Sequence, residues 1–226
     1  MANNERPATA GEIDPELDAA AIENGRLLFA HECRFIFGAA SLDALPPPDL
    51  TEIAFAGRSN VGKSSLVNAL TGRRTLARVS HTPGRTRQIN FFLLGEALVL
   101  VDLPGYGYAK ASKTLIRDWT NLVENYLRGR PSLRRLCLLI DSRHGIKPPD
   151  RDLMDMLDAS AVSYQTVLTK IDKASSIARV RDEVATELSR HSAAHPTIHL
   201  TSARTGAGVE TLRTAIAALA TPARLG

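Results

Sequence analysis

The sequence predicts an α/β protein built on a doubly wound, mostly parallel sheet of six strands, one of them antiparallel, with helices on both faces. Three observations support this prediction. Short apolar segments alternate with segments of helical periodicity from Leu50 to the C-terminus. A glycine-rich octet at residues 57–64 stands between the first apolar segment and the first helical one. Only Gly95 and Glu96 separate the second and third apolar segments, which permits a hairpin and forbids a parallel crossover.

Six strands and five helices are expected from residue 50 onward. The strands are expected at residues 53–56, 89–94, 97–101, 136–140, 162–168 and 197–200. The helices are expected at residues 63–71, 112–127, 149–159, 175–191 and 208–220. In such a sheet, ligands bind beyond the carboxyl ends of the strands, so functional residues are expected in the loops that follow them.

The first 49 residues lie outside this alternation. Residues 1–25 are rich in Ala, Glu, Asn and Asp, and they predict a mobile tail with one short helix near residues 15–24. Residues 26–49 predict an N-terminal extension that packs on the main domain, ending in the stiff run Pro46-Pro-Pro48. The main domain is expected to span residues 50–226.

Composition limits the class of protein. The chain has 226 residues, 44% of them hydrophobic, which suits one globular domain with an appendage. No apolar run approaches the ~18 residues of a membrane span, and the N-terminus lacks the pattern of a signal peptide. Cys33 and Cys137 are the only cysteines, too few for a disulfide framework or a four-ligand zinc site. We therefore expect a cytoplasmic protein.

The net charge of +4 is modest, but the basic residues are clustered. One cluster is Arg73, Arg74, Arg78, Arg85 and Arg87, and a second is Arg128, Arg130, Arg134 and Arg135, preceded by Lys110, Lys113 and Arg117. Such clusters suit the phosphate backbone of RNA, and the alternative is a solvated basic face without a partner.

The octet Gly-Arg-Ser-Asn-Val-Gly-Lys-Ser at residues 57–64 is a full match to the phosphate-loop pattern GxxxxGK[ST]. Its glycines allow backbone N–H groups to approach a phosphate chain. Lys63 can reach the β- and γ-phosphates, and the Ser64 hydroxyl can ligate Mg²⁺. The following helix places the phosphates at a helix N-terminus. The octet therefore predicts a nucleotide ligand, either ATP or GTP.

Two motifs follow strand ends in the order expected of a phosphate-loop enzyme. In Asp102-Leu-Pro-Gly105 the carboxylate can hold Mg²⁺ through its water shell, and the glycine N–H can meet the γ-phosphate. In Thr169-Lys-Ile-Asp172 the Asp172 carboxylate can accept two hydrogen bonds from guanine, whereas adenine presents an acceptor at that edge. The Lys170 stem can cover the base. The alternative role of Asp172 is a helix N-cap.

Two loops complete the set. A backbone N–H in Thr201-Ser-Ala203 can donate to guanine O6. Residues 80–87 contain the Gly, Pro and Thr of a mobile segment, in which a threonine can complete Mg²⁺ and γ-phosphate coordination when GTP binds. On chemistry alone, Thr82 and Thr86 both fit this role.

The motifs, in this order, resemble those of the translation-factor-related GTPases, and within them the EngB (YihA/YsxC) family of bacterial ribosome-assembly GTPases. The resemblance is carried by residues 52–65, Thr82-Pro-Gly-Arg-Thr86, Asp102-Leu-Pro-Gly-Tyr-Gly-Tyr-Ala109 and Thr169-Lys-Ile-Asp-Lys173. It implies a P-loop GTPase domain at residues 50–226, GTP and Mg²⁺ binding, slow GTP hydrolysis and a role in maturing the large ribosomal subunit. It also implies that Thr86 is the Mg²⁺ ligand of the mobile segment.

The expected site residues can now be named. Nucleotide and cofactor contacts are expected from Gly57, Arg58, Ser59, Asn60, Val61, Gly62, Lys63, Ser64, Gly84, Arg85, Thr86, Arg87, Gln88, Asp102, Leu103, Pro104, Gly105, Thr169, Lys170, Ile171, Asp172, Thr201, Ser202 and Ala203. The expected catalytic residues are Lys63, Asn60 and Thr86, and the expected metal ligands are Ser64 and Thr86.

Many small GTPases place a water-orienting glutamine directly after the Asp-x-x-Gly glycine, where this chain has Tyr106. We hypothesise that Tyr106 points away from the nucleotide. Similar GTPases with an apolar residue here often use K⁺ and carry an asparagine where this chain has Asn60. The resemblance therefore implies that the Asn60 side-chain oxygen helps to hold K⁺ next to the phosphates; the alternative is that Asn60 only braces the loop. Tyr106 and Tyr108 are also expected to present aromatic rings to RNA, unless they pack in the core.

The leading functional hypothesis is a GTP-dependent switch in assembly of the large ribosomal subunit. A second hypothesis is a GTP-gated module that recruits a protein partner, for example in cell division and septation, with little hydrolysis. A third, an ATP-dependent kinase or transport ATPase, is disfavoured by Asp172. The expected partners are GTP or GDP and the large subunit with its rRNA. No membrane or DNA contact is expected, and the protein is expected to be a monomer.

Overall fold

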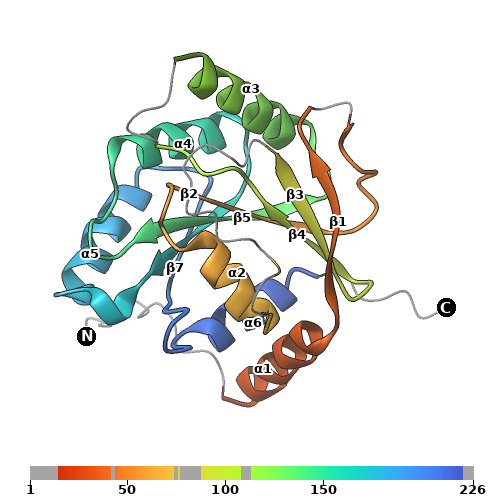
Figure 1. Ribbon diagram of the computed structural model, residues 1–226. Helices are drawn as coiled ribbons and strands as arrows, with labels where there is room; N and C mark the ends of the chain where they lie inside the picture. The colour runs from red at the N-terminus through yellow and green to blue at the C-terminus, as the bar shows by residue number, and fades with distance from the viewer. Residues whose placement is uncertain (1–14, 42–43, 74–75, 77–87, 108–112, 221–226) are drawn as a thin grey trace, which may run out of the picture.

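The computed structural model describes residues 15–41, 44–73, 76, 88–107 and 113–220. The elements follow in the order α1 (Pro15–Ala30), β1 (Cys33–Ala39), β2 (Glu52–Gly57), α2 (Lys63–Thr71), β3 (Ile89–Leu94), β4 (Leu98–Asp102), α3 (Lys113–Gly129), β5 (Leu133–Asp141), α4 (Pro148–Ala159), β6 (Tyr164–Thr169), the 3-10 turn η2 (Ile171–Lys173), α5 (Ile177–Leu188), β7 (Ala194–Leu200) and α6 (Val209–Ala217). They form one sheet with helices on both faces (Figure 1).

The sheet is mostly parallel and has the strand order β1-β3-β4-β2-β5-β6-β7. Strands β4, β2, β5, β6 and β7 pair in parallel. Strand β3 is antiparallel to both of its neighbours, β1 and β4, so it alone runs against the rest of the described sheet. The predicted α/β class, the mostly parallel sheet and the antiparallel strand are confirmed.

The prediction of six strands is wrong, because the sheet has seven. The additional strand is β1, which lies at the edge and pairs with β3. Its register shifts between Phe35 and Phe37, and both of these rings are largely exposed. A bulge on an edge strand breaks the two-residue alternation that marks a strand in sequence, which explains why β1 was missed.

Each face of the sheet is covered by three helices. Helices α3, α4 and α5 pack on one face, through side chains that include Val123, Leu153 and Val184. Helices α1, α2 and α6 pack on the other face, through side chains that include Phe29, Leu66 and Leu212. Because strands β2 and β4 are buried on both sides, they consist mostly of apolar residues, as parallel strands in α/β proteins do.

Helix α1 is longer than the helix expected near residues 15–24, and the expected boundary between tail and extension at residue 25 falls inside it. The helix packs along α6, where an added Cβ on Gly25 would lie 2.9 Å from the backbone nitrogen of Thr214. Its aromatic contact with the core, Phe29, is 4% exposed. These two contacts, at Gly25 and Phe29, lie at or beyond the expected boundary, so residues 1–25 alone indicated only a short helix.

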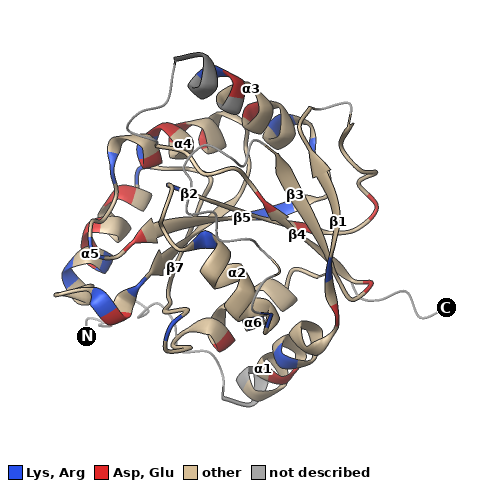
Figure 2. Ribbon diagram, in the orientation of Figure 1, with Lys and Arg blue, Asp and Glu red and all other residues tan. Residues whose placement is uncertain are grey.

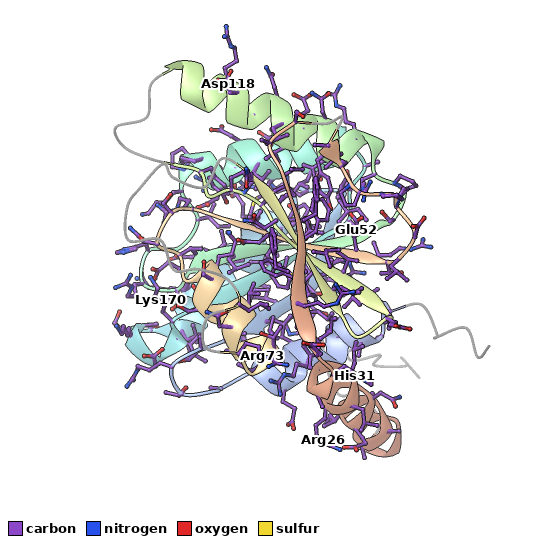
Figure 3. All side chains as sticks on the ribbon, turned by 45° about the vertical axis from the view of Figure 1, so that its right-hand side comes forward. Arg26, His31, Glu52, Arg73, Asp118 and Lys170 are labelled. Carbon is purple, nitrogen blue, oxygen red and sulfur yellow. The ribbon has the colours of Figure 1, made fainter. Side chains whose placement is uncertain are left out.

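A buried ion pair lies at the end of the sheet away from the strand ends that carry the predicted motifs. Glu52, the first residue of β2, pairs with Arg130 and accepts a hydrogen bond of 2.8 Å from the Tyr126 hydroxyl. In Figure 3, Glu52 and Lys170 lie on opposite sides of the molecule. The carboxyl edge of the sheet is thereby left to the functional site.

Candidate functional site

The octet at residues 57–64 connects β2 to α2, as the sequence predicts. An added Cβ on Gly57 would lie 2.8 Å from Val61 Cγ1 and 3.1 Å from Leu139 Cβ, so only glycine fits there. Gly62 caps α2 with a φ of 107°. Asn60 has a φ of 64°, a left-handed conformation that asparagine tolerates better than most residues. The loop therefore curls around the N-terminus of α2, where backbone N–H groups favour an anion.

Lys63 and Asp102 form an ion pair in which both side chains are about nine-tenths buried. Asp102 ends β4, and Ser64 follows Lys63 in the first turn of α2. A carboxylate and a hydroxyl are oxygen donors of the kind that Mg²⁺ takes when phosphate oxygens and water complete its shell. Such a site does not require a cluster of His, Cys, Asp or Glu side chains, and the described residues contain no group of three or more of them. The residues present therefore fit Mg²⁺ bound together with a phosphate chain.

A pocket of about 290 Å³ opens between the phosphate loop and the segments after β6 and β7. Its lining residues are Gly62, Ser65, Leu66, Thr169, Lys170, Asp172, Lys173, Thr201, Ala203 and Arg204. The structure thus brings together three motifs from separate parts of the sequence. Its volume is at the lower end of the range for small-molecule sites, and suits a base with part of its sugar.

Asp172 is held in this pocket by two donors. Its Oδ1 accepts a hydrogen bond of 2.6 Å from the Ser202 hydroxyl, and its Oδ2 accepts one of 2.8 Å from Arg204 Nε. The bond from Ser202, followed by that from Arg204, lowers the pKa of Asp172 and keeps the carboxylate ionised. Each carboxylate oxygen has two lone pairs, so both remain able to accept a further hydrogen bond from a ligand.

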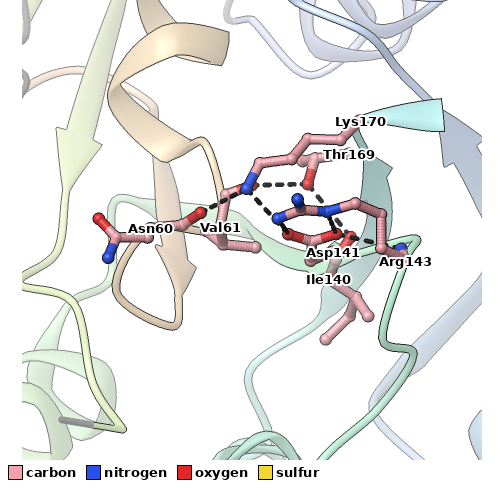
Figure 4. Close-up of polar contacts among 7 residues, drawn as sticks. All are labelled: Asn60, Val61, Ile140, Asp141, Arg143, Thr169 and Lys170. Atoms are coloured by element: carbon pink, nitrogen blue, oxygen red, sulfur yellow. Dashed lines mark hydrogen bonds and ion pairs between the residues drawn. The ribbon is translucent and has the colours of Figure 1, made fainter. Parts of the chain in front are cut away.

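A network beneath the pocket ties the segment after β6 to the phosphate loop (Figure 4). Lys170 Nζ donates to the backbone oxygen of Asn60 at 2.6 Å and to Asp141 Oδ2 at 2.8 Å. The Thr169 hydroxyl donates to the backbone oxygen of Val61 at 2.7 Å. Because the Lys170 ammonium is drawn toward the loop, its stem passes over Gly62, with Cε 3.5 Å from the position of an added Cβ.

Asp141 and Arg143 belong to this network and were not predicted. Arg143 Nε and Nη2 donate to the two oxygens of Asp141 at 2.9 and 2.7 Å. Burial alone would raise the pKa of Asp141, but the hydrogen bonds from Arg143 and Lys170 outweigh it and hold the pKa well below its usual range. One signal was available, since Asp141 is the polar residue that ends the apolar strand β5 at the same edge as the motifs.

Tyr106 points into the core, in agreement with the hypothesis that it does not face the nucleotide. The side chain is 5% exposed and its hydroxyl donates to Asp150 Oδ1 at 2.8 Å. Burial, followed by the charge of Asp150, raises the pKa of Tyr106 well above its usual range, so the hydroxyl stays protonated. The expectation that its ring is presented to RNA is therefore wrong, and Tyr108 lies outside the described residues.

The remaining predicted residues divide into three groups. Gly84, Arg85, Thr86 and Arg87, together with Thr82, lie outside the described residues. Leu103 is fully buried and Pro104 is buried, whereas Gly105 packs against Ser59. Gln88 is exposed beside β1, with Oε1 2.8 Å from the position of an added Cβ on Gly38, rather than in the pocket.

The second basic cluster is less uniform than the sequence implies, and most of the first cluster lies outside the described residues. Arg130 is buried against Glu52 and stacks over the Phe91 ring at 5.7 Å, so it is not available to a partner. Arg128 pairs with Glu124, while Arg134 is exposed. Figure 2 shows basic and acidic residues interspersed on α5. The basic side chains of the second cluster that the structure describes therefore do not all face solvent as free charges.

A family model described as "50S ribosome-binding GTPase" matches residues 52–170. The chain is 59% identical over 226 residues to the probable GTP-binding protein EngB of Rhodospirillum rubrum, covering 96% of this chain and 98% of that one. It is 54% identical over 209 residues to the protein of the same description from Cereibacter sphaeroides, covering 92% and 96%.

A solved structure supports the fold. The crystal structure of a probable GTP-binding protein EngB superposes with a TM-score of 0.62 at 23% identity, covering 75% of this chain and 98% of that one. At this identity the match bears on the fold alone. Among the helices that the structure describes, none is long and apolar enough to cross a membrane.

Proposed function

The chain belongs to the EngB family of P-loop GTPases, and from this premise we propose that it hydrolyses GTP slowly and acts as a nucleotide-dependent switch in assembly of the large ribosomal subunit. GTP binding and GTPase activity follow from the family. The proposal adds the ribosomal partner and the low rate. The observation that carries the partner is the match of residues 52–170 to a family described as 50S ribosome-binding GTPases. Action on ribosomes would place the protein in the cytoplasm.

The binding roles follow from the positions of the side chains. We assign the phosphates to the loop at residues 57–64 and the guanine base to the pocket beside Asp172. The Asp172 carboxylate would accept hydrogen bonds from N1–H and the exocyclic amine of guanine, and adenine would leave it unpaired. The Lys170 stem would cover one face of the base.

We assign Mg²⁺ to Ser64 and, through water, to Asp102, with Thr86 as the ligand from the segment outside the described residues. When bound, the ion would neutralise charge that develops on the phosphate oxygens. Lys63, at the same place, contributes a positive charge to the β- and γ-phosphates. The low rate is proposed because the position of the water-orienting glutamine is occupied by Tyr106, whose hydroxyl is committed to Asp150.

Co-sedimentation with ribosomal subunits tests the partner and the switch together. Purified subunits are mixed with the protein in the presence of a non-hydrolysable GTP analogue or of GDP, and are sedimented at several salt concentrations. We expect the protein to sediment with the large subunit, preferentially with the GTP analogue. Binding should weaken as salt rises, because contacts with RNA phosphates release counterions.

Asp172→Asn provides a matched control. It replaces one carboxylate oxygen by an amide that donates, so affinity for GTP should fall by roughly 100-fold or more. The same amide matches the 2-carbonyl of xanthine, so a xanthosine triphosphate analogue should restore co-sedimentation. Equal co-sedimentation with the GTP analogue and GDP would refute the switch. Absence from both subunits would refute the ribosomal partner and favour recruitment of a protein.

A further inference from the structure

Asp150 lies in the first turn of α4 and has no exposed surface. Its Oδ2 accepts a hydrogen bond of 2.8 Å from the backbone N–H of Lys147, as helix-capping residues do, and its Oδ1 accepts the Tyr106 hydroxyl at 2.8 Å. Arg58 Nε lies 3.4 Å from Oδ2. Capping would need one oxygen, but this carboxylate joins three separate segments of the chain.

Two of these segments belong to the functional site. Arg58 is the second residue of the phosphate loop, and Tyr106 directly follows Gly105, whose N–H is expected to meet the γ-phosphate. Burial of a carboxylate is unfavourable and raises the pKa of Asp150. Asp150 is the third residue of the helix, where a neutral glutamine can accept the same hydrogen bond from the N-cap backbone without this penalty. The charge is therefore better explained by its pairing with Arg58 and Tyr106.

The main chain of Tyr106 is joined to the phosphate loop as well. Arg58 and Tyr106 form a parallel β-bridge. The Ser59 N–H donates to the Tyr106 carbonyl at 3.0 Å, and the Tyr106 N–H donates to the Gly57 carbonyl at 3.4 Å. Tyr106 is thus fixed to the phosphate loop through its main chain and to α4 through its hydroxyl.

Gly107 closes this arrangement. Its φ of 72° is left-handed, and an added Cβ would lie 3.4 Å from Cγ and Cδ of Arg58 and 3.8 Å from Cβ of Pro149. The chain therefore turns over the Arg58 stem immediately after Tyr106. Residues 105–107 are fitted between the phosphate loop and the start of α4, with Asp150 at the centre of the contact.

We propose that Asp150 is a positioning residue for GTP hydrolysis, which holds Arg58 and Tyr106 so that the γ-phosphate side of the site is fixed against α4. Tyr106 takes no part in the chemistry. It occupies the place of a catalytic glutamine in other GTPases and serves here as the link between Gly105 and α4. This inference rests on the proposed nucleotide site.

Two substitutions test it. Asp150→Asn retains the shape and an oxygen acceptor but removes the charge, and Tyr106→Phe removes only the hydroxyl. Each should lower the single-turnover rate of GTP hydrolysis by about tenfold, since small misplacements of reacting groups have effects of this size. Each should leave the Kd for GDP within about twofold of the wild type, because GDP has no γ-phosphate to be misplaced. The double variant should be no slower than the slower single variant.

Asp152→Asn is the matched control, since Asp152 is exposed on the same helix. A lower melting temperature with an unchanged hydrolysis rate in Asp150→Asn would show that the residue is a helix cap only. If the rate of the double variant fell by the product of the two single effects, Asp150 and Tyr106 would act independently, and action through Tyr106 would be refuted. Loss of GDP affinity together with the rate would refute a role confined to the γ-phosphate side. A wild-type protein that fails to bind GDP would instead refute the nucleotide site itself.

Discussion

Asn60 and Lys170 are two of the three described non-glycine residues with a left-handed backbone, the third being Ala161. Their φ angles are 64° and 59°. Residues held in this conformation are each strained by ~1 kcal/mol or more, and they persist where surrounding contacts determine them. The contact here is direct, since Lys170 Nζ donates to the Asn60 carbonyl at 2.6 Å. The phosphate loop and the segment after β6 are thus strained and joined at the same point.

The Asn60 side chain allows a test of the proposed use of K⁺. The residue is exposed, and its amide oxygen could help to hold a cation beside the phosphates. Wild-type turnover should be faster in KCl than in NaCl, by up to roughly 100-fold, the lower end of the effect of one charge-stabilising group. Asn60→Gly should abolish this difference, because it removes the amide while glycine keeps the left-handed backbone free of strain. Steady-state phosphate release in the two salts measures it.

Asn60→Ala separates the cation from the backbone. Like Asn60→Gly, this variant lacks the amide, but it retains the backbone strain. Any loss of turnover beyond that of Asn60→Gly therefore reports on the loop conformation alone. Equal wild-type turnover in the two salts would refute K⁺ use and leave Asn60 as a residue that braces the loop.

At the scale of elements, α1 is attached to the nucleotide-binding domain through α6. Arg213 of α6 donates from Nε to the Leu70 carbonyl at 2.8 Å and from Nη2 to the Ala69 carbonyl at 3.0 Å, near the end of α2. Its guanidinium also lies 5.7 Å from the centre of the Phe29 ring of α1. Helices from both ends of the chain therefore brace the helix that follows the phosphate loop.

Gly25→Ala should destabilise the protein although alanine favours helices. The added methyl group would lie 2.9 Å from Thr214 N, 3.0 Å from Thr214 Cα and 3.1 Å from Arg213 C, all backbone atoms of α6. Such overpacking costs about 1–3 kcal/mol, more than the ~1 kcal/mol gained in helix propensity. Urea denaturation measures the free energy of unfolding. Gly129→Ala is the matched control, because nothing lies within 4 Å of its Cβ position. An equal increase in the free energy of unfolding in both variants would show that α1 can move away from α6 without a loss of stability.

At the scale of the whole molecule, acid should reduce stability through His199 on β7. Burial, the neighbouring His195 and the charge of Arg135 lower the pKa of His199 to about 4, against a usual value of 6.5. The unfolded chain therefore binds a proton first. Stability is fully present above about pH 6.5 and declines as the pH falls toward 4, by roughly 2 kcal/mol between pH 7 and pH 5. Asp141 acts in a separate window, below its usual pKa of 3.8.

Unfolding in urea at pH 7 and pH 5 measures this dependence. His199→Gln cannot titrate, so its free energy of unfolding should change less between the two pH values than that of the wild type, whatever its absolute stability. The exposed His144 supplies the control, since His144→Gln should keep the wild-type dependence. If the pH dependence of the free energy of unfolding persisted in His199→Gln, it would have to come from other titratable groups.

Much of the fold and of the site could be predicted from short segments. The strand before Gly57, the helix after it and the hairpin around Gly95 each depend on neighbouring residues, so local patterns sufficed. Strand β1 could not be predicted, because it has a bulge and because its partner strand β3 lies more than 50 residues further along the chain from that bulge. Asp150 was also missed because distant contacts determine its environment. A carboxylate in a helix normally faces solvent, and only the tertiary packing buries this one.

By itself the sequence determined the ligand class and the mostly parallel character of the sheet, because the phosphate loop and the segment Thr169–Asp172 are continuous and follow strands that local patterns reveal. Only the tertiary structure decided how those segments support one another. The contacts from Lys170 to Asn60, from Asp141 to Lys170 and from Asp150 to Arg58 and Tyr106 join loops that follow different strands. Parallel strands bring their carboxyl ends to one edge of the sheet, and that convergence, which no local pattern contains, builds the site.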